Sequence, residues 1–111
     1  MNMSVGILGT GWVGASVAIS TLHAGFASEL LLADLRSVVA EGEAMDLAHG
    51  AAFYPTTIVR AVAPHDLLAT DALVIAAGRG GKPGESRLDL LRENASTLRS
   101  IGETLREYRG P

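Results

Sequence analysis

Short apolar runs alternate with amphipathic segments along the chain. Residues 3–8 form an apolar run that ends at a glycine, which is typical of a buried strand. The apolar positions that follow recur every three or four residues, as on one face of a helix: Val13, Val17, Ala18, Thr21 and Leu22. The pattern therefore predicts a strand followed by a helix that stops at Gly25.

The same alternation continues beyond Gly25. Glu29–Asp34 contains three consecutive leucines and predicts a strand buried on both faces, and Ser37 is the expected N-cap of a second helix ending near His49-Gly50. Residues 57–62 and 71–77 are further strand candidates. The apolar positions of the second helix are Val38, Val39, Met45 and Leu47. A long last helix carries Leu88, Leu91, Ala95, Leu98, Ile101, Leu105 and Tyr108 at helical spacing.

The turn between the first strand and the first helix carries a glycine motif. It reads Gly9-Thr10-Gly11-Trp12-Val13-Gly14, which fits G-x-G-x-x-G. Gly9 permits a tight turn, Gly11 lets a pyrophosphate approach the backbone, and Gly14 allows the helix to pack closely. The free N–H groups at the start of the helix favour phosphate oxygens. No Gly-Lys-Ser/Thr follows, so the motif predicts a dinucleotide site rather than a mononucleotide P-loop.

Asp34 lies 20 residues beyond Gly14, at the end of the second predicted strand. An acid at this place accepts hydrogen bonds from the adenosine ribose and repels a 2′-phosphate, so NAD is favoured over NADP. Arg36 is a reservation, because a nearby arginine can accommodate that phosphate. The alternative is an ordinary glycine turn and an unrelated strand-end acid.

Together these elements predict an α/β fold. Parallel strands alternate with amphipathic helices, so we expect a Rossmann-type doubly wound sheet, covered on both faces, with strand order 3-2-1-4. We also expect the sheet to be truncated after the fourth strand and its following helix.

Composition narrows the class of protein. The chain has 111 residues, 48% of them hydrophobic, which suits one small domain with a core. Nine Lys and Arg against twelve Asp and Glu argue against nucleic-acid and membrane-surface binding. The absence of cysteine excludes disulfides, thiolate nucleophiles and Cys-ligated zinc. Without a signal-peptide pattern or an apolar span, we expect a cytoplasmic protein.

A second glycine-rich loop follows the fourth predicted strand and reads Ala77-Gly78-Arg79-Gly80-Gly81-Lys82-Pro83-Gly84-Glu85-Ser86-Arg87. In a doubly wound sheet this loop lies at the switch point where ligands bind. Its glycines permit a hinge motion, and Lys82 and Arg87 suit an anionic substrate. The alternative is a flexible surface loop with solvated cations.

These two loops, Asp34, the segment Glu43–Gly50 and Asn94 occur in an order that resembles the amino-terminal, NAD-binding part of the L-lactate/malate dehydrogenase family. The Lys-Pro-Gly-Glu-Ser-Arg stretch at residues 82–87 is specific to that family, and the resemblance covers nearly the whole chain. It implies an NAD-dependent oxidoreductase acting on a 2-hydroxy or 2-oxo acid. It also implies that the segment Glu43–Gly50 packs against a second copy in a homo-oligomer.

The resemblance also implies roles for single residues. Arg87 would be the catalytic arginine that polarises the 2-oxo group, and Asn94 would touch cofactor or substrate. The implied cofactor-binding residues are Gly9, Gly11, Trp12, Val13, Gly14, Asp34, Gly78, Arg79 and Asn94. We expect Trp12 to pack at the start of its helix rather than to stack on the nicotinamide.

The chain departs from the family pattern at two points. Gly81 stands where lactate enzymes usually have Gln and malate enzymes Arg, which weakens the malate interpretation and leaves room for a bulkier 2-oxo acid, although Lys82 could supply a cation. The family's catalytic His, its Asp partner and the carboxylate-binding Arg lie beyond the matching region. We therefore expect residues 1–111 to be an incomplete NAD-binding domain, inactive alone, without the substrate domain.

Two other functions remain open: a non-catalytic nucleotide-binding module and a remnant without function. The three histidines, His23, His49 and His65, are too scattered for a metal site and are expected to be structural or solvated. Because Arg87 and its loop are useful to a dehydrogenase and not to a simple NAD sensor, the sequence favours the enzyme.

Overall fold

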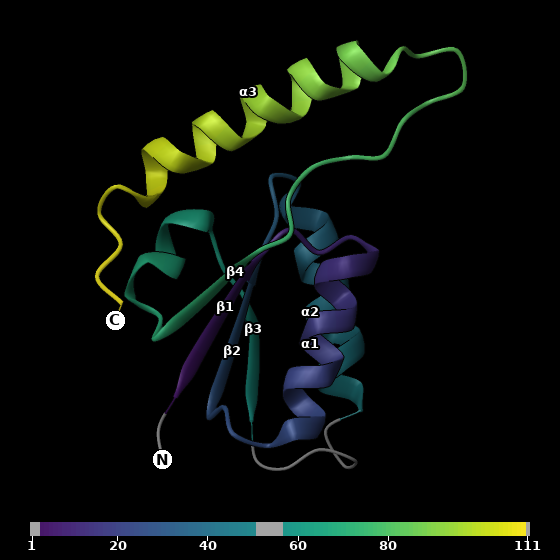
Figure 1. Ribbon diagram of the computed structural model, residues 1–111. Coiled ribbons are helices and arrows are strands. Elements are labelled where there is room, and N and C mark those ends of the chain that lie inside the picture. Colours follow the sequence, from purple (N-terminus) through teal and green to yellow (C-terminus); the bar gives the residue numbers. More distant parts are fainter. Residues whose placement is uncertain (1–2, 51–56, 111) are drawn as a thin grey trace.

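The computed structural model describes residues 3–50 and 57–110. Its strands form one parallel sheet in the order β3-β2-β1-β4, which confirms the predicted doubly wound arrangement (Figure 1). The strands are β1 (Ser4–Leu8), β2 (Glu29–Ala33), β3 (Ile58–Ala61) and β4 (Ala72–Ile75). The strand order changes direction between β1 and β4, so the loops after these two strands meet at the switch point.

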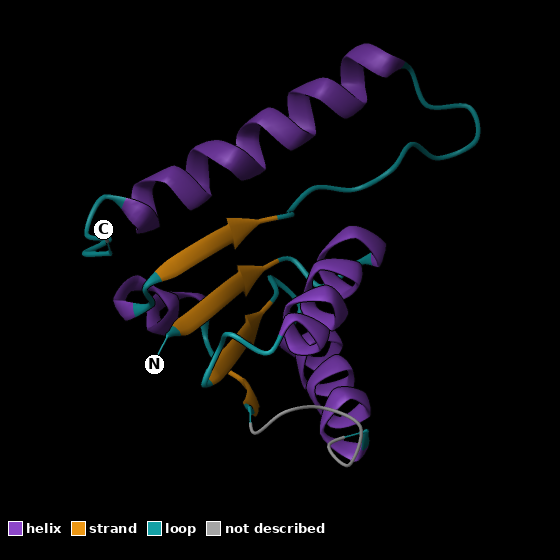
Figure 2. Cartoon of the chain, turned by 60° about the horizontal axis from the view of Figure 1, so that its bottom comes forward, coloured by secondary structure: helices purple, strands orange, loops and turns teal. Residues whose placement is uncertain are grey.

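Two helices, α1 (Trp12–Ala24) and α2 (Ser37–His49), lie side by side on one face of the sheet (Figures 1 and 2). Gly25 ends α1 as predicted, in the left-handed region with φ 72°. The core of this layer joins alternate residues of β1 and β2 to the inner faces of the two helices: Val5, Ile7, Ala18, Leu22, Ala27, Leu30, Leu32, Ala44 and Leu47.

The inner face of α2 differs from the prediction. Small residues, Ala40 and Ala44, lie against the sheet together with Leu47, whereas Val38 and Met45 are 75% and 60% exposed. A helix that packs closely on a parallel sheet presents its small side chains there. The prediction was therefore wrong for Val38 and Met45, whereas Leu47 is buried as predicted. Ser37 is the first residue of α2 rather than its N-cap.

The opposite face of the sheet carries a short 3₁₀ helix, η2 (Pro64–Ala69), and the end of α3 (Arg87–Leu105). Leu8, Leu31, Ala33 and Leu67 form a second core cluster with Ile101 of α3. Both faces are thus occupied, but this one less fully than predicted.

Most of α3 projects away from the sheet (Figure 1). Ile101 is its buried residue, whereas Leu88, Leu91 and Leu98 are all more than half exposed. The expectation that the long helix covers the sheet is wrong for its first part, because the long loop after β4 carries the start of the helix outward.

The segment after α3 returns to η2. Tyr108, expected within the helix, lies beyond its end, and its hydroxyl donates to the backbone oxygen of Thr70 at 2.8 Å. The N–H of Arg109 donates to Leu68 O at 3.2 Å. These two contacts attach the end of the described chain to η2 and to the residue that caps it.

Candidate functional site

A groove of about 510 Å³ opens where the predicted motifs meet, at the carboxyl ends of the strands. It is bounded by the turn after β1, the end of β2, the loop after β4 and the middle of α3. Its lining residues are Leu8, Gly9, Gly11, Asp34, Leu35, Arg36, Val39, Ala76, Ala77, Gly78, Arg79, Lys82, Glu93, Asn94 and Thr97. The groove therefore combines six of the predicted site residues, Gly9, Gly11, Asp34, Gly78, Arg79 and Asn94.

The glycine turn has the geometry that its sequence predicts. Gly9 has φ +102°, and a Cβ there would lie 2.5 Å from Ala76 O. A Cβ at Gly14 would lie 1.8 Å from Gly9 O, so the first turn of α1 can pack this close to the glycine turn only because residue 14 is a glycine. A Cβ at Gly11 would meet no atom within 4 Å, since this residue faces the open groove. The turn thus presents bare backbone to a ligand.

Asp34 is held at the end of β2 by three donors. Its Oδ2 accepts from the N–H of Thr10 at 2.8 Å and from the Thr10 hydroxyl at 3.1 Å, while its Oδ1 accepts from the N–H of Arg36 at 3.0 Å. Partial burial by itself would raise the pKa of Asp34, but these hydrogen bonds and the Arg36 charge lower it below its usual value. The groove therefore contains an ionised, oriented acceptor.

Asn94 joins α3 to the loop after β4. Its Oδ1 accepts from the N–H of Arg79 at 3.1 Å, and its Nδ2 donates to Arg79 O at 3.2 Å. Gly78 precedes this contact with φ +127°, and a Cβ there would lie 3.4 Å from Asn94 Oδ1. The side chain of Asn94 therefore shapes the groove by fixing the backbone of Arg79 in the loop after β4.

Arg79, which lines the groove, forms an ion-pair cluster with two carboxylates. Its Nη1 donates to Glu85 at 2.8 Å and its Nε to Glu93 at 2.9 Å, and Nη2 contacts both carboxylates. The hydrogen bonds from Arg79 lower the pKa of Glu85 to about 2 and also lower that of Glu93. Two carboxylates thus neutralise the Arg79 charge and tie the loop to α3.

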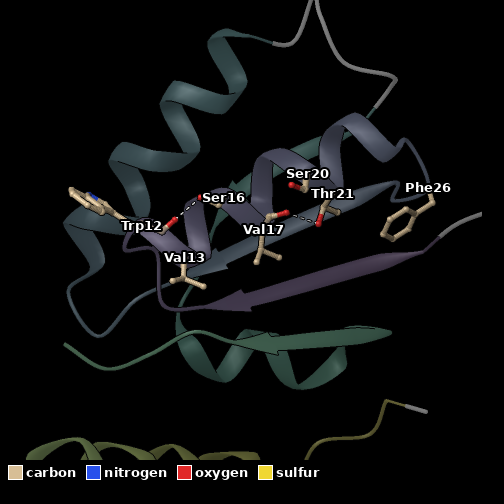
Figure 3. Close-up of a pocket in the computed structure, with 7 residues that line it drawn as sticks. All are labelled: Trp12, Val13, Ser16, Val17, Ser20, Thr21 and Phe26. Atoms are coloured by element: carbon tan, nitrogen blue, oxygen red, sulfur yellow. Dashed lines mark hydrogen bonds between the residues drawn. The ribbon is translucent and has the colours of Figure 1, made fainter. Parts of the chain in front are cut away.

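Trp12 and Val13 are not among the residues that line the groove, and they lie at the start of α1 (Figure 3). They line a shallow hollow on α1, with Val17 and Phe26, and are 94% and 68% exposed. The expectation that Trp12 packs at the start of the helix is wrong. The first residues of α1 follow the turn directly, and these two side chains point away from the core.

The substrate residues implied by the resemblance lie along the loop at the outer end of the groove. Lys82 lines the groove, Gly81 is exposed, and a Cβ at Gly81 would lie 3.6 Å from Leu90 Cδ2. Arg87 is exposed at the first residue of α3, which Ser86 caps by accepting from Asp89 N at 3.1 Å. Arg87 does not line the groove in this arrangement of the loop.

Other parts of the surface bear on function as well. His23, His49 and His65 are exposed, and in residues 3–50 and 57–110 no three His, Asp or Glu side chains gather as a metal site. No helix in the same ranges is long and apolar enough to cross a membrane.

On the outer surface of α2, Met45, Asp46, Ala48 and His49 are exposed.

Several groove residues were missed or misjudged from the sequence. Glu93 and Thr97 flank the predicted Asn94, and Thr97 lies one helical turn beyond it, so helical spacing alone would have found it. The partnership of Arg79 with Glu85 and Glu93 carried no such signal, because it depends on how the loop folds back onto α3.

A parallel sheet of this order, a glycine turn at its switch point and an acid at the end of β2 define a dinucleotide-binding domain. The model of the lactate/malate dehydrogenase NAD binding domain matches residues 3–110. The chain therefore belongs to the lactate/malate dehydrogenase family, as an NAD-binding domain.

Individual relatives agree with this assignment. The chain is 38% identical over 107 residues to L-lactate dehydrogenase 1 of Clostridium acetobutylicum, covering 96% of this chain and 34% of that one. It is 46% identical over 101 residues to an L-lactate dehydrogenase of Lactococcus lactis subsp. cremoris, covering 90% and 32%. The chain thus spans about a third of the length of the curated relatives it matches.

Solved structures of the family show the same fold. The ligand-bound minor L-lactate dehydrogenase of Enterococcus mundtii superposes with a TM-score of 0.90 at 35% identity, covering 98% of this chain and 36% of that one. The malate dehydrogenase of Archaeoglobus fulgidus in complex with NADH gives a TM-score of 0.83 at 39% identity, covering 96% and 37%. The predicted family and fold class are confirmed.

Proposed function

We propose that this groove holds NAD as the cofactor-binding part of a dehydrogenase that interconverts 2-hydroxy and 2-oxo acids. The observation that carries the proposal is the pairing of the bare Gly11 backbone with the ionised Asp34 carboxylate in one groove of about 510 Å³. The glycine leaves space for a pyrophosphate, and the carboxylate is an acceptor for ribose hydroxyls.

The residues present fit this cofactor. The cap residue Gly11 makes no side-chain cap bond, so the first N–H groups of α1 are available to phosphate oxygens. Asp34 would accept from the adenosine ribose, and Gly78 and Asn94 would border the nicotinamide half of the groove. Bound NAD supplies hydride acceptance or donation, which no side chain of this chain provides.

For the substrate we propose a small 2-oxo or 2-hydroxy carboxylate. Arg87 carries a permanent charge at the start of α3 and would polarise the 2-oxo group when the loop of residues 78–86 closes. Gly81 offers no charge for a second carboxylate, which favours a monocarboxylate. The residues that transfer the proton in this family lie outside the matched region, so we expect no turnover from residues 1–111 alone.

We further propose that the outer surface of α2, within Glu43–Gly50, contacts a second copy. The exposed apolar Met45 on this surface supports the proposal. Sedimentation of Met45→Asp beside wild type tests it, because a charge there should lower the oligomeric state. An unchanged mass distribution would argue against this surface.

The NAD site is tested with the 111-residue chain itself. Binding is measured by isothermal titration calorimetry, because the side chain of the single tryptophan, Trp12, is exposed and does not line the groove. Titration with NAD should saturate in wild type and fail in Gly11→Val, which fills the open side of the turn. Gly42→Val is the matched control, because its Cβ also meets nothing within 4 Å but lies on α2 outside the groove. Equal loss in both variants, or no binding by wild type, would contradict the proposal.

A further inference from the structure

Thr10, the residue between the first two glycines of the turn, is almost fully buried at 4% exposure. Two other buried threonines, Thr21 and Thr70, donate their hydroxyls to nearby backbone oxygens. The Thr10 hydroxyl instead donates to Asp34 Oδ2, 24 residues away on another element. Its contact is therefore with a side chain of the groove rather than with local backbone.

The contact belongs to a larger junction. Thr10 N–H donates to the same Oδ2 at 2.8 Å, and Gly9 N–H donates to Ala33 O at 2.8 Å. Three hydrogen bonds thus join two consecutive residues of the turn after β1 to two consecutive residues at the end of β2. The pyrophosphate side and the ribose side of the groove are therefore held at a fixed separation.

The Asp34 carboxylate has few remaining acceptor positions. A carboxylate accepts about four hydrogen bonds, and three are already taken, two of them on Oδ2 by Thr10 and one on Oδ1 by Arg36. With donors on both oxygens the carboxylate cannot rotate freely. The free acceptor capacity is consequently left in one direction, on the partly exposed side of Asp34 that lines the groove.

We propose that Thr10 is a positioning residue for adenosine-ribose recognition, its buried hydroxyl holding Asp34 in the orientation that accepts from the 2′-hydroxyl. The inference rests on the proposed function, since it assumes that NAD occupies the groove. The backbone N–H of Thr10 is present whatever the side chain, so the specific contribution of this residue is its hydroxyl.

The test separates ribose recognition from general support of the turn. Thr10→Val replaces the hydroxyl by a methyl group of similar size, and Thr10→Ser keeps the hydroxyl. Each is titrated calorimetrically with NAD and with an NAD analogue that lacks the 2′-hydroxyl on the adenosine ribose. Thr10→Val should weaken NAD binding about 5- to 20-fold and change binding of the analogue less than about twofold. Thr10→Ser should bind NAD as wild type does, to within about threefold.

Each outcome decides something. Equal weakening of both ligands means that Thr10 only supports the turn, and unchanged NAD binding means that its hydroxyl is dispensable; either overturns the inference. A wild-type chain that binds neither ligand overturns the proposed function, whereas one that binds both alike shows that Asp34 does not read the ribose. If Thr10→Val does not fold, Thr10→Ala and Thr10→Ser give the same comparison. As the pH falls, NAD affinity should then be lost at a higher pH in Thr10→Ala than in Thr10→Ser. The reason is that Thr10→Ala lacks the side-chain hydrogen bond that lowers the pKa of Asp34.

Discussion

Gly14 in the first turn of α1 lies directly against the backbone of Gly9, so that a Cβ on Gly14 would approach Gly9 O to 1.8 Å. The carbonyl belongs to the turn that leads into the same helix. The third glycine of the motif is therefore needed for a contact with Gly9, five residues earlier, because only a glycine lets the start of the helix pack against the turn that precedes it.

This contact predicts the effect of Gly14→Ala. The added methyl must displace either the helix or the turn, at a cost of about 1–3 kcal/mol in the free energy of unfolding, as in other overpacked sites. Urea denaturation of the 111-residue chain measures it. Gly42→Ala is the control, since a methyl there meets open space in α2 and should stabilise the chain by up to about 1 kcal/mol. Similar effects in both variants would contradict the steric explanation.

Asp34→Ser should change which dinucleotide is preferred. The substitution removes the negative charge that repels a 2′-phosphate and leaves the Arg36 charge on the same wall of the groove. We expect the ratio of NADP to NAD affinity to rise at least about tenfold, which parallel titrations measure. Asp46→Ser removes an exposed acid from α2 and should leave the ratio unchanged. A ratio that stays the same in Asp34→Ser would show that this acid does not read the ribose.

Asn94→Leu should weaken NAD binding with little effect on folding. The variant keeps the side-chain size but loses both hydrogen bonds to the Arg79 backbone, which shape the loop bordering the groove. We expect a rise in Kd of about 5- to 20-fold, by calorimetric titration. Ser96→Ala, at an exposed position two residues along α3, provides the comparison and should bind as wild type does. Equal NAD affinities in Asn94→Leu and Ser96→Ala would show that Asn94 does not contribute to NAD binding.

The cluster of Arg79, Glu85 and Glu93 predicts a pH dependence of the loop. Hydrogen bonds from Arg79 lower the pKa of Glu85 from 4.5 to about 2. A lowered folded-state pKa means that the contribution of Glu85 is complete above pH 4.5 and is lost as the pH falls toward about 2. NMR titration of the Glu85 carboxyl and of the loop amides measures this loss.

Arg79→Gln provides the matched comparison for that titration. Without the guanidinium, Glu85 should titrate near 4.5 and the amides of residues 80–86 should shift with it. Glu103→Gln, whose exposed partner Arg106 is the C-cap of α3, should leave the loop titration unchanged. A Glu85 carboxyl that titrates near 4.5 in wild type would rule out the cluster as a fixed feature.

The sequence predicted those parts of the fold and site that local pattern determines. Gly9 and Gly14 are required by backbone geometry, and Asp34 follows from its place at the end of an apolar strand. The strand order followed from the same alternation of strands and helices. These features are determined within a few residues or by rules of chain connection.

The errors arose where burial depends on a distant partner. The apolar stripe of α3 shows which side of the helix is apolar, but it does not say what lies against it, and Leu88 and Leu91 are exposed. Trp12 was expected to pack at the start of its helix, but its side chain is 94% exposed. The G-x-G-x-x-G spacing does not determine the direction in which that side chain leaves the turn.

The attachment of α3 to the sheet at Ile101 gives the helix the mechanics of a lever. Arg87 and Ile101 are separated by a helical rise of about 21 Å, so a rotation of about 10° at the attached end carries Arg87 through about 4 Å. The ion pairs of Arg79 with Glu85 and Glu93 and the two hydrogen bonds of Asn94 bind the loop to the same helix. A rotation of this size about Ile101 would therefore displace Arg87 and the attached loop together relative to the groove.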